Sequence, residues 1–106
     1  MGVPFTTGFD PGDLPDHFAR HGPDYGATNA QVYEQMADTF FGSPKGATVL
    51  ECIRRRGDLV RFNPQTCEFG VMGATRILRT YYIKLNLRQR SYADKLAFFQ
   101  VKCQRF

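Results

Sequence analysis

Two histidines four residues apart, His17 and His21, are the only histidines in the chain. A short helix that begins after Asp13 and runs through Arg20 is expected to stack the two imidazoles on one face. Because imidazole titrates near neutral pH, such a pair can share the donor and acceptor roles of proton transfer. This spacing also suits zinc, although the glutamate of an HExxH motif is missing. Either histidine alone could instead cap the helix or pack against an aromatic ring.

Arg61, Thr80 and Tyr82 are further candidates, and all three fall in predicted strands. An arginine held rigidly on a sheet can bind a phosphate through two parallel hydrogen bonds. The hydroxyls of Thr80 and Tyr82 lie two residues apart on one strand face, where they can donate to a phosphate oxygen. The structural alternative for Arg61 is an ion pair with Glu51 or Glu68.

Positive charge is concentrated in the second part of the chain. Residues 1–44 hold one basic and six acidic side chains, whereas residues 45–106 hold thirteen basic and four acidic ones. This asymmetry is typical of a protein that binds a polyanion, although an ordinary solvated basic surface is the alternative. The residues predicted to bind the substrate are Arg54, Arg55, Arg56, Arg79 and Lys84.

The periodicity of apolar residues predicts an α+β fold with two N-terminal helices packed on a four-stranded antiparallel sheet, followed by a C-terminal helix. Residues 1–12 are interpreted as a lead-in or linker, and residues 13–106 as one domain. A capping box at Thr28 opens the second helix, which extends to about Phe41. The predicted strands cover residues 48–54, 58–63, 68–72 and 76–84, and the last helix covers residues 92–103. Strand alternation predicts one apolar sheet face and one polar face bearing Arg61, Thr80, Tyr82 and Lys84.

The three cysteines, Cys52, Cys67 and Cys103, form no CxxC pair and have no metal-like spacing. They are expected to be buried or idle thiols in a reducing compartment. No run approaches the roughly 18 apolar residues of a membrane span. The first fifteen residues also lack the features of a signal peptide.

Several kinds of catalytic motif are absent from the sequence. It has no GxxxxGK[ST], no GxSxG, no HxE with CxxC and no acidic cluster for a two-metal nuclease. The remaining residues suit metal-free acid–base chemistry on a phosphodiester. RNA is the better substrate for this chemistry, because its 2′-hydroxyl is an internal nucleophile already in place.

The string DHFARHGPDYGATNAQVYEQMADTFFGSP, followed by RRGDLVRFNPQTCEFGVMGATRILRTYYIK, resembles the C-terminal toxin domains of bacterial polymorphic toxins. Such domains occur in contact-dependent growth inhibition and Rhs-type proteins and belong to the barnase, EndoU, colicin and RelE group of ribonuclease folds. The resemblance covers roughly residues 14–84 and lies in HxxxHG, GDxVRxxPxTxEFGV and RTYY. It implies the same helix-and-sheet arrangement, metal-free ribonuclease activity and a cognate immunity protein. The site residues it implies are His17, His21, Arg61, Thr80 and Tyr82.

The function expected from these observations is that of a cytotoxic, metal-independent and cofactor-free endoribonuclease. It would cleave tRNA or another structured RNA through 2′-hydroxyl attack, leaving a 2′,3′-cyclic phosphate. Delivered as part of a larger toxin, it would act in the cytoplasm of a target bacterium, as a monomer when no inhibitor is bound. One alternative is a non-catalytic RNA-binding or antitoxin-like module. A second is an ADP-ribosyltransferase toxin, for which Glu51 and Glu68 are the only glutamates in the predicted sheet.

Overall fold

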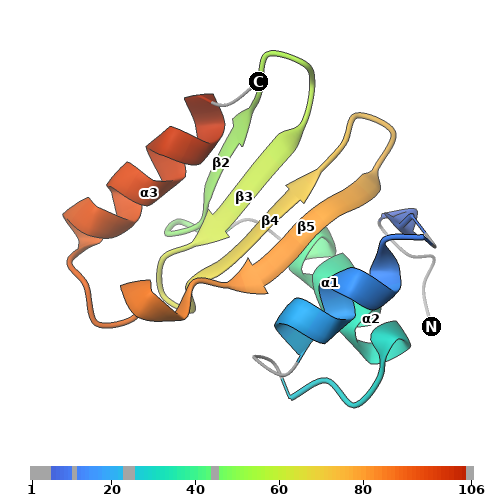
Figure 1. Ribbon diagram of the computed structural model, residues 1–106. Helices are drawn as coiled ribbons and strands as arrows, with labels where there is room; N and C mark the ends of the chain where they lie inside the picture. The colour runs from blue at the N-terminus through green and yellow to red at the C-terminus, as the bar shows by residue number, and fades with distance from the viewer. Residues whose placement is uncertain (1–5, 11, 23–25, 44–45, 105–106) are drawn as a thin grey trace.

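A computed structural model describes residues 6–10, 12–22, 26–43 and 46–104. The chain forms an α+β fold (Figure 1), in which most predicted helices and strands are present within one or two residues of the expected bounds. Residues 1–5 and Pro11 of the predicted lead-in lie outside the described residues. In chain order the elements are β1 (Gly8–Phe9), α1 (Leu14–His21), α2 (Ala30–Gly42), β2 (Leu50–Ile53), β3 (Leu59–Asn63), β4 (Glu68–Met72), β5 (Ile77–Ile83), the 3-10 helix η2 (Leu85–Leu87) and α3 (Tyr92–Gln104).

The sheet has five strands in the order β1-β5-β4-β3-β2, and it is mixed rather than wholly antiparallel. The four predicted strands pair as antiparallel neighbours, but β1 adds a fifth strand parallel to β5. Part of the predicted lead-in therefore belongs to the domain. Two side chains of α2 hold it in place: Glu34 accepts a hydrogen bond from the Phe9 N–H at 2.9 Å, and Asp38 accepts one from the Thr6 hydroxyl at 2.8 Å. A two-residue strand has no alternation by which the sequence could indicate it.

Helix α2 begins directly after Asn29, whose side chain accepts a hydrogen bond from the Val32 N–H at 2.9 Å. The cap is therefore Asn29 rather than the predicted Thr28, and it satisfies one of the backbone donors at the start of the helix. The helix ends where Ser43 adopts an extended conformation. None of the described helices is long and apolar enough to cross a membrane.

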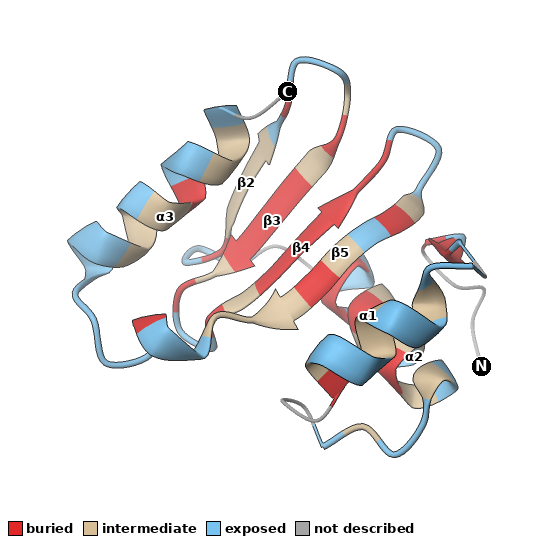
Figure 2. Ribbon diagram, in the orientation of Figure 1, coloured by how far each residue is buried: buried red, intermediate tan, exposed pale blue. Residues whose placement is uncertain are grey.

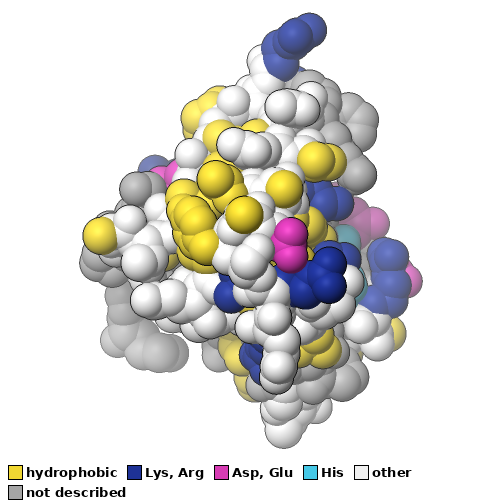
Figure 3. Space-filling view, turned by 90° about the vertical axis from the view of Figure 1, so that its left-hand side faces the viewer, with side chains coloured by type: hydrophobic (Ala, Val, Ile, Leu, Met, Phe, Trp, Pro, Cys, Tyr) yellow, Lys and Arg dark blue, Asp and Glu magenta, His cyan; other side chains and the backbone are white. Residues whose placement is uncertain are grey.

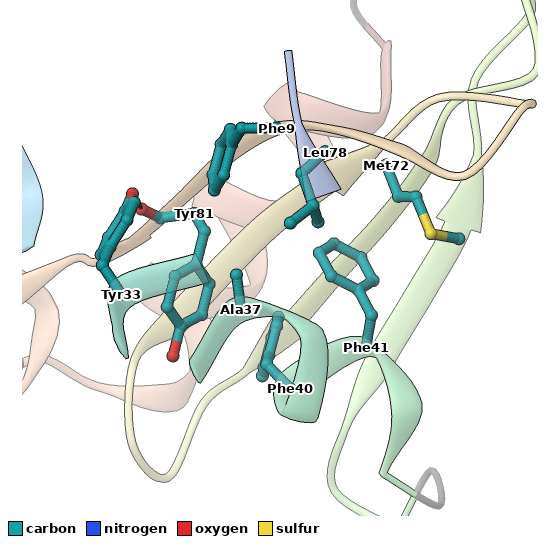
Figure 4. Close-up of a cluster of buried hydrophobic side chains, with 8 residues drawn as sticks. All are labelled: Phe9, Tyr33, Ala37, Phe40, Phe41, Met72, Leu78 and Tyr81. Carbon is teal, nitrogen blue, oxygen red and sulfur yellow. Dashed lines mark hydrogen bonds between the residues drawn. The ribbon is translucent and has the colours of Figure 1, made fainter. Parts of the chain in front are cut away.

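Both faces of the sheet are buried, so the predicted division into an apolar face and a polar face is wrong (Figure 2). Helices α1 and α2 pack on one face and α3 packs on the other, against β2 and β3. The first face holds the cluster in Figure 4, composed of Phe9, Tyr33, Ala37, Phe40, Phe41, Met72, Leu78 and Tyr81. The second cluster, beneath α3, is composed of Val60, Phe62, Cys67, Phe69, Val71, Leu87 and Phe99.

A β-bulge in β5 decides which side chains share a face. Val71 pairs with Thr80, whereas Met72 pairs with Leu78, so that Arg79 is an extra residue between them. The bulge reverses, at Arg79, the alternation of β5 side chains between the two faces of the sheet. Leu78 therefore lies in the α2-side cluster with Tyr81, and not on the face of Thr80 as strict alternation predicts.

A disulfide between Cys52 of β2 and Cys103 of α3 joins the C-terminal helix to the sheet. The prediction that all three cysteines are idle thiols is therefore wrong for these two. Cys67 is free and buried, as predicted. The two bonded cysteines are 51 residues apart, and no local spacing pattern indicates the pairing. Packing of α3 brings their Cα atoms to 6.2 Å, within the range of a disulfide.

Candidate functional site

His17 lies on the same face of α1 as the second histidine, as predicted, with 6.5 Å between the ring centroids. Its ring packs against Phe9 at 4.8 Å between centroids, and its Nδ1 atom is buried without a hydrogen-bond partner among the described residues. Burial lowers the pKa of His17 and the charge of Arg20 lowers it further, against smaller opposing effects of Asp13 and Asp16. The His17 imidazole is therefore mostly neutral at pH 7, the form that can accept a proton.

His21 stacks on the Tyr82 ring, with ring centroids 5.1 Å apart and an interplanar angle of 26°. This contact joins the last residue of α1 to strand β5. Gly22, which follows His21, is buried, and a Cβ atom at this position would overlap the Phe18 ring. Packing therefore explains the glycine of the HxxxHG motif, because a residue without a side chain allows α1 to end close to β5.

Thr80 and Tyr82 lie on one face of β5 because they are two residues apart, beyond the bulge. Their strand partners are Val71 and Phe69, which belong to the α3-side cluster. Both Thr80 and Tyr82 are half-buried, and α1 packs along this strand. Four of the five predicted catalytic residues thus lie on α1 or on β5, the strand that α1 contacts. We call this group the histidine–tyrosine site: His17, His21, Thr80 and Tyr82.

Two lysines lie on the α3 side of the same sheet face. The Nζ atoms of Lys84 and Lys102 are 5.7 and 5.6 Å from the centroid of the Phe98 ring, and Lys102 Nζ is also 5.9 Å from that of Phe69. The Phe69 ring in turn lies 5.2 Å from the Tyr82 ring. Figure 3, which views the molecule from the α3 side, shows Lys and Arg side chains beside hydrophobic ones, with histidine surface at the right. The face that bears the hydroxyls therefore also carries ammonium groups.

Arg61 is not part of the histidine–tyrosine site. Its Nη1 and Nη2 atoms donate hydrogen bonds of 2.9 and 2.8 Å to the carbonyl oxygens of Phe41 and Ser43, at the C-terminal end of α2. Its Nε atom lies 3.6 Å from Glu51, and its guanidinium lies 5.6 Å from the Phe40 centroid. Arg61 binds the helix end, where a cation is favourable, and the predicted alternative of an ion pair with Glu51 is present.

Strand register places Arg61 on the opposite sheet face from the hydroxyls. Arg61 pairs with Gly70, which pairs with Tyr81, so all three lie on the α2 side. A continuous series of aromatic rings separates Arg61 from His17, and neighbouring centroids in it are 5.5–5.8 Å apart. In order from His17, these rings are Phe9, Tyr33, Tyr81 and Phe40.

Three of the predicted substrate-binding arginines surround Asp58, which is only 1% exposed. Arg56 and Arg79 each donate from Nε to one carboxylate oxygen at 3.0 Å, and Arg54 Nη1 lies 3.7 Å from it. Burial favours the neutral form of Asp58, but Arg56 and Arg79 together outweigh this effect and hold its pKa below the ordinary value. Arg54 is itself buried and donates to the Lys102 carbonyl oxygen at 2.8 Å, so it has a structural role. The fourth arginine, Arg55, is exposed on the β2–β3 turn.

Sequence reasoning missed Asp58, Phe98 and Lys102. Asp58 follows Gly57 in the predicted turn. Because aspartate is common in exposed turns, the sequence does not indicate that this one is buried. Phe98 and Lys102 are four residues apart and therefore share one face of α3. This spacing is visible in the sequence, but only the packing of α3 shows that the pair covers Phe69.

A pocket of about 510 Å³ lies on the α2 side of the sheet, and its lining includes Arg61, Glu68 and Tyr81. The Glu68 carboxylate accepts hydrogen bonds from the Tyr81 hydroxyl at 2.7 Å and from the Thr66 hydroxyl at 3.0 Å. Arg61 is held by the helix end, as described above. The pocket's charged groups therefore have partners within the protein, and none of its lining residues is a histidine.

Among the described residues, no three His, Cys, Asp or Glu side chains come together as a metal-binding group. The chain matches no model of a known protein family, and no curated protein shows significant similarity to it. The resemblance to toxin domains thus depends on the short sequence motifs alone.

Proposed function

We propose that the protein is a metal-independent endoribonuclease whose reaction takes place at the histidine–tyrosine site. The observation that carries this proposal is the stacking of His21 on Tyr82, at 5.1 Å between ring centroids. This contact brings His21 to the strand that bears the two hydroxyls, and lysine ammonium groups lie on the same sheet face as these hydroxyls. His17 lies beside His21 on α1 and packs against Phe9. These are the groups that cleavage of RNA through its own 2′-hydroxyl requires.

In the proposed reaction the 2′-oxygen forms a bond to phosphorus while the bond from phosphorus to the 5′-oxygen breaks. His17 accepts the 2′-hydroxyl proton, because its lowered pKa keeps it neutral at pH 7. His21 or Tyr82 gives a proton to the departing 5′-oxygen, and the product ends in a 2′,3′-cyclic phosphate. Thr80 donates to a non-bridging oxygen, on which negative charge increases in the transition state.

Lys84 and Lys102 take the electrostatic role that the sequence assigned to Arg61. Both lie on the α3 side, over the rings of Phe98 or Phe69, and Phe69 contacts Tyr82 directly. Ammonium groups attract a phosphate as compact charges, without the fixed geometry of a guanidinium. We therefore assign the lysines to attraction of the RNA backbone, and Arg61 to the stability of α2.

The biological setting follows from the resemblance to polymorphic toxins. In this setting the domain is delivered as part of a larger toxin into a target bacterium, where it cleaves tRNA or another structured RNA in the cytoplasm. A cognate immunity protein protects the producing cell. The motifs HxxxHG, GDxVRxxPxTxEFGV and RTYY support this setting, as does the excess of positive charge in residues 45–106.

The test is cleavage of total bacterial RNA by the purified protein in EDTA, with analysis of the new 3′ ends. Cleavage should proceed and leave cyclic phosphates. His17→Ala and His21→Ala should each lower the rate by roughly 100-fold or more. Gln31→Ala, at an exposed position of α2, is the matched control and should leave the rate unchanged. Thermal unfolding must show that both histidine variants are folded.

Two outcomes would contradict the proposal. Cleavage that appears only after a divalent ion is added would exclude the metal-free reaction. Salt-dependent RNA binding without cleavage under any condition would favour the non-catalytic RNA-binding module instead.

A further inference from the structure

A second cavity, of about 500 Å³, lies where the first turns of α3 meet the turn between β3 and β4, at one end of the sheet (Figure 1). Its volume falls within the range of roughly 300–1,000 Å³ that is usual for small-molecule sites. It shares no lining residue with the cavity on the α2 side or with the histidine–tyrosine site. The residues that line it are Ala47, Thr48, Pro64, Gln65, Tyr92 and Lys95.

Tyr92 and Lys95 give this cavity an aromatic wall and a positive charge. They are three residues apart on α3, so their side chains share one face of the helix. The Lys95 Nζ atom donates a hydrogen bond to the Pro64 carbonyl oxygen at 2.8 Å, which holds the ammonium group beside the β3–β4 turn. An ammonium group has three N–H donors, so two remain for a ligand.

The Tyr92 ring is available for stacking. Its side chain is 57% exposed, and it contacts no other aromatic ring among the described residues. A nucleic-acid base can cover such a ring, because every base has a flat π-face. The exposed side chains of Thr48 and Gln65 add a hydroxyl and an amide to the same cavity, and both can hydrogen-bond to the edge of a base or to a sugar.

Positive charge predominates in the chain around the start of α3. Residues 84–95 contain four basic side chains and one acidic side chain. The acidic one, Asp94, forms an ion pair with Arg90 at 3.2 Å. Lys84, Arg88 and Lys95 form no ion pair within the described part of the chain. An anionic group is therefore attracted to this end of the molecule.

Aromatic contacts connect the cavity's helix to the histidine–tyrosine site. Phe98 follows Lys95 by three residues on α3, and its ring lies 5.2 Å from the Phe69 ring. The Phe69 ring lies 5.2 Å from the Tyr82 ring, and Lys84 Nζ lies 5.7 Å from the Phe98 centroid. The cavity and the hydroxyls of β5 are thus both on the α3 side of the sheet.

We propose that this cavity binds one nucleotide of RNA, whose base stacks on Tyr92 and whose phosphate accepts hydrogen bonds from Lys95. The nucleotide is unpaired, because a base inside a duplex stacks on its neighbours and cannot cover a side-chain ring. The assignment to the RNA substrate rests on the proposed function. Nucleotide binding in the cavity can nevertheless be measured without any cleavage.

The first experiment titrates the protein with adenosine and with adenosine 5′-monophosphate and follows the backbone amide signals by NMR. The signals of Gln65, Tyr92 and Lys95 should shift with both ligands. The monophosphate should bind about 10-fold more tightly, because only it carries the phosphate. Lys95→Gln, which keeps a donor for Pro64, should abolish this difference between the two ligands.

Substitution of Tyr92 tests the stacking. Tyr92→Ala should weaken both ligands by roughly 5- to 100-fold, whereas Tyr92→Phe should leave both affinities unchanged, because the ring and not the hydroxyl contacts the base. Gln100→Ala, at an exposed position of α3, is the control and should leave both affinities unchanged. Far-UV circular dichroism must show that every variant is folded.

The second experiment uses RNA itself. A 2′-O-methyl dodecanucleotide of mixed sequence has no free 2′-hydroxyl, so it binds without being cleaved. Its Kd is measured by fluorescence anisotropy. Tyr92→Ala should raise the Kd for the single strand by roughly 5- to 100-fold and should leave the Kd for the annealed duplex unchanged.

The outcomes separate this inference from the proposed function. A protein that cleaves RNA but shows no shifts in the cavity, or shows shifts only on α1 and β5, would refute the nucleotide site alone. Shifts in the cavity of a protein that cleaves no RNA would support the site and refute the proposed function. If adenosine 5′-monophosphate binds in the cavity but Tyr92→Ala leaves the Kd of the single strand unchanged, the site takes a free nucleotide and the assignment to RNA is wrong.

Discussion

Replacement of Arg61 by methionine tests whether this arginine serves the fold or the reaction. Methionine has a similar length and keeps the contact with Phe40, but it cannot donate to the Phe41 and Ser43 carbonyl oxygens. It also leaves Glu51 without the charge 3.6 Å away. The structure therefore predicts a loss of stability and no specific loss of chemistry.

The expected loss of stability follows from the hydrogen bonds that Arg61 makes. Hydrogen bonds that involve a charged group contribute about 1.5–3 kcal/mol each. The full sum is an overestimate, because the Ser43 end is only partly buried and because methionine avoids the cost of desolvating a guanidinium that is 4% exposed. We expect a decrease of about 3 kcal/mol in the free energy of unfolding. With an m-value of about 1.5 kcal/mol/M, the urea midpoint should fall by about 2 M.

Urea unfolding followed by far-UV circular dichroism measures this shift. The control is Arg55→Met, in which an exposed arginine of the β2–β3 turn is replaced and stability should change by no more than about 0.5 kcal/mol. RNA cleavage is then measured without urea and normalised to the folded fraction. The normalised rate of Arg61→Met should remain within a few-fold of wild type. An unchanged midpoint together with abolished cleavage would refute the assignment and return Arg61 to the reacting site.

Two further predictions concern the whole fold. Reduction of the Cys52–Cys103 disulfide opens a loop with a sequence separation of 51. The chain-entropy relation predicts that the free energy of unfolding then falls by about 4 kcal/mol. Thermal unfolding with and without reductant measures this change, and an equal Tm in both conditions would contradict the entropic account. The pKa of His17 in the folded protein lies below its ordinary value of 6.5. Below pH 6.5 the His17 side chain is therefore protonated more readily in the unfolded chain than in the folded one. The free energy of unfolding should consequently fall as the pH decreases from 6.5 towards the folded-state pKa. His17→Asn should flatten this part of the stability curve, and an unchanged slope would show that His17 is readily protonated in the folded protein.

Much of the local structure could be predicted because it depends on neighbours in the sequence. The bounds of β4 follow from Gly and turn residues on either side, and the buried stripe of α2 follows from the spacing of Tyr33, Ala37, Phe40 and Phe41. The His17–His21 pairing is likewise a property of helix geometry. These features need no information about where the elements lie in space.

The structure does not bring all five predicted site residues to one sheet face, and strand register explains why. Alternation within one strand fixes which residues share a face of that strand, but it does not say which face meets α2 and which meets α3. Register places Arg61 beside Gly70 and Tyr81, and the bulge at Arg79 turns Thr80 to the opposite face. The sequence contains no local mark of either arrangement.

The sequence by itself thus determined the helices, the four longer strands, the α+β class and the pairing of two imidazoles, since all of these arise from contacts within a few residues. Tertiary structure alone decided that Arg61 binds the end of α2, that Asp58 gathers three arginines and that Cys52 bonds to Cys103. The contacts of Arg61, the Arg79–Asp58 pair and the disulfide join separate elements, whereas Arg54 and Arg56 lie in the same turn as Asp58. Their partners are selected by burial and by strand register, which the order of residues encodes only through the complete fold.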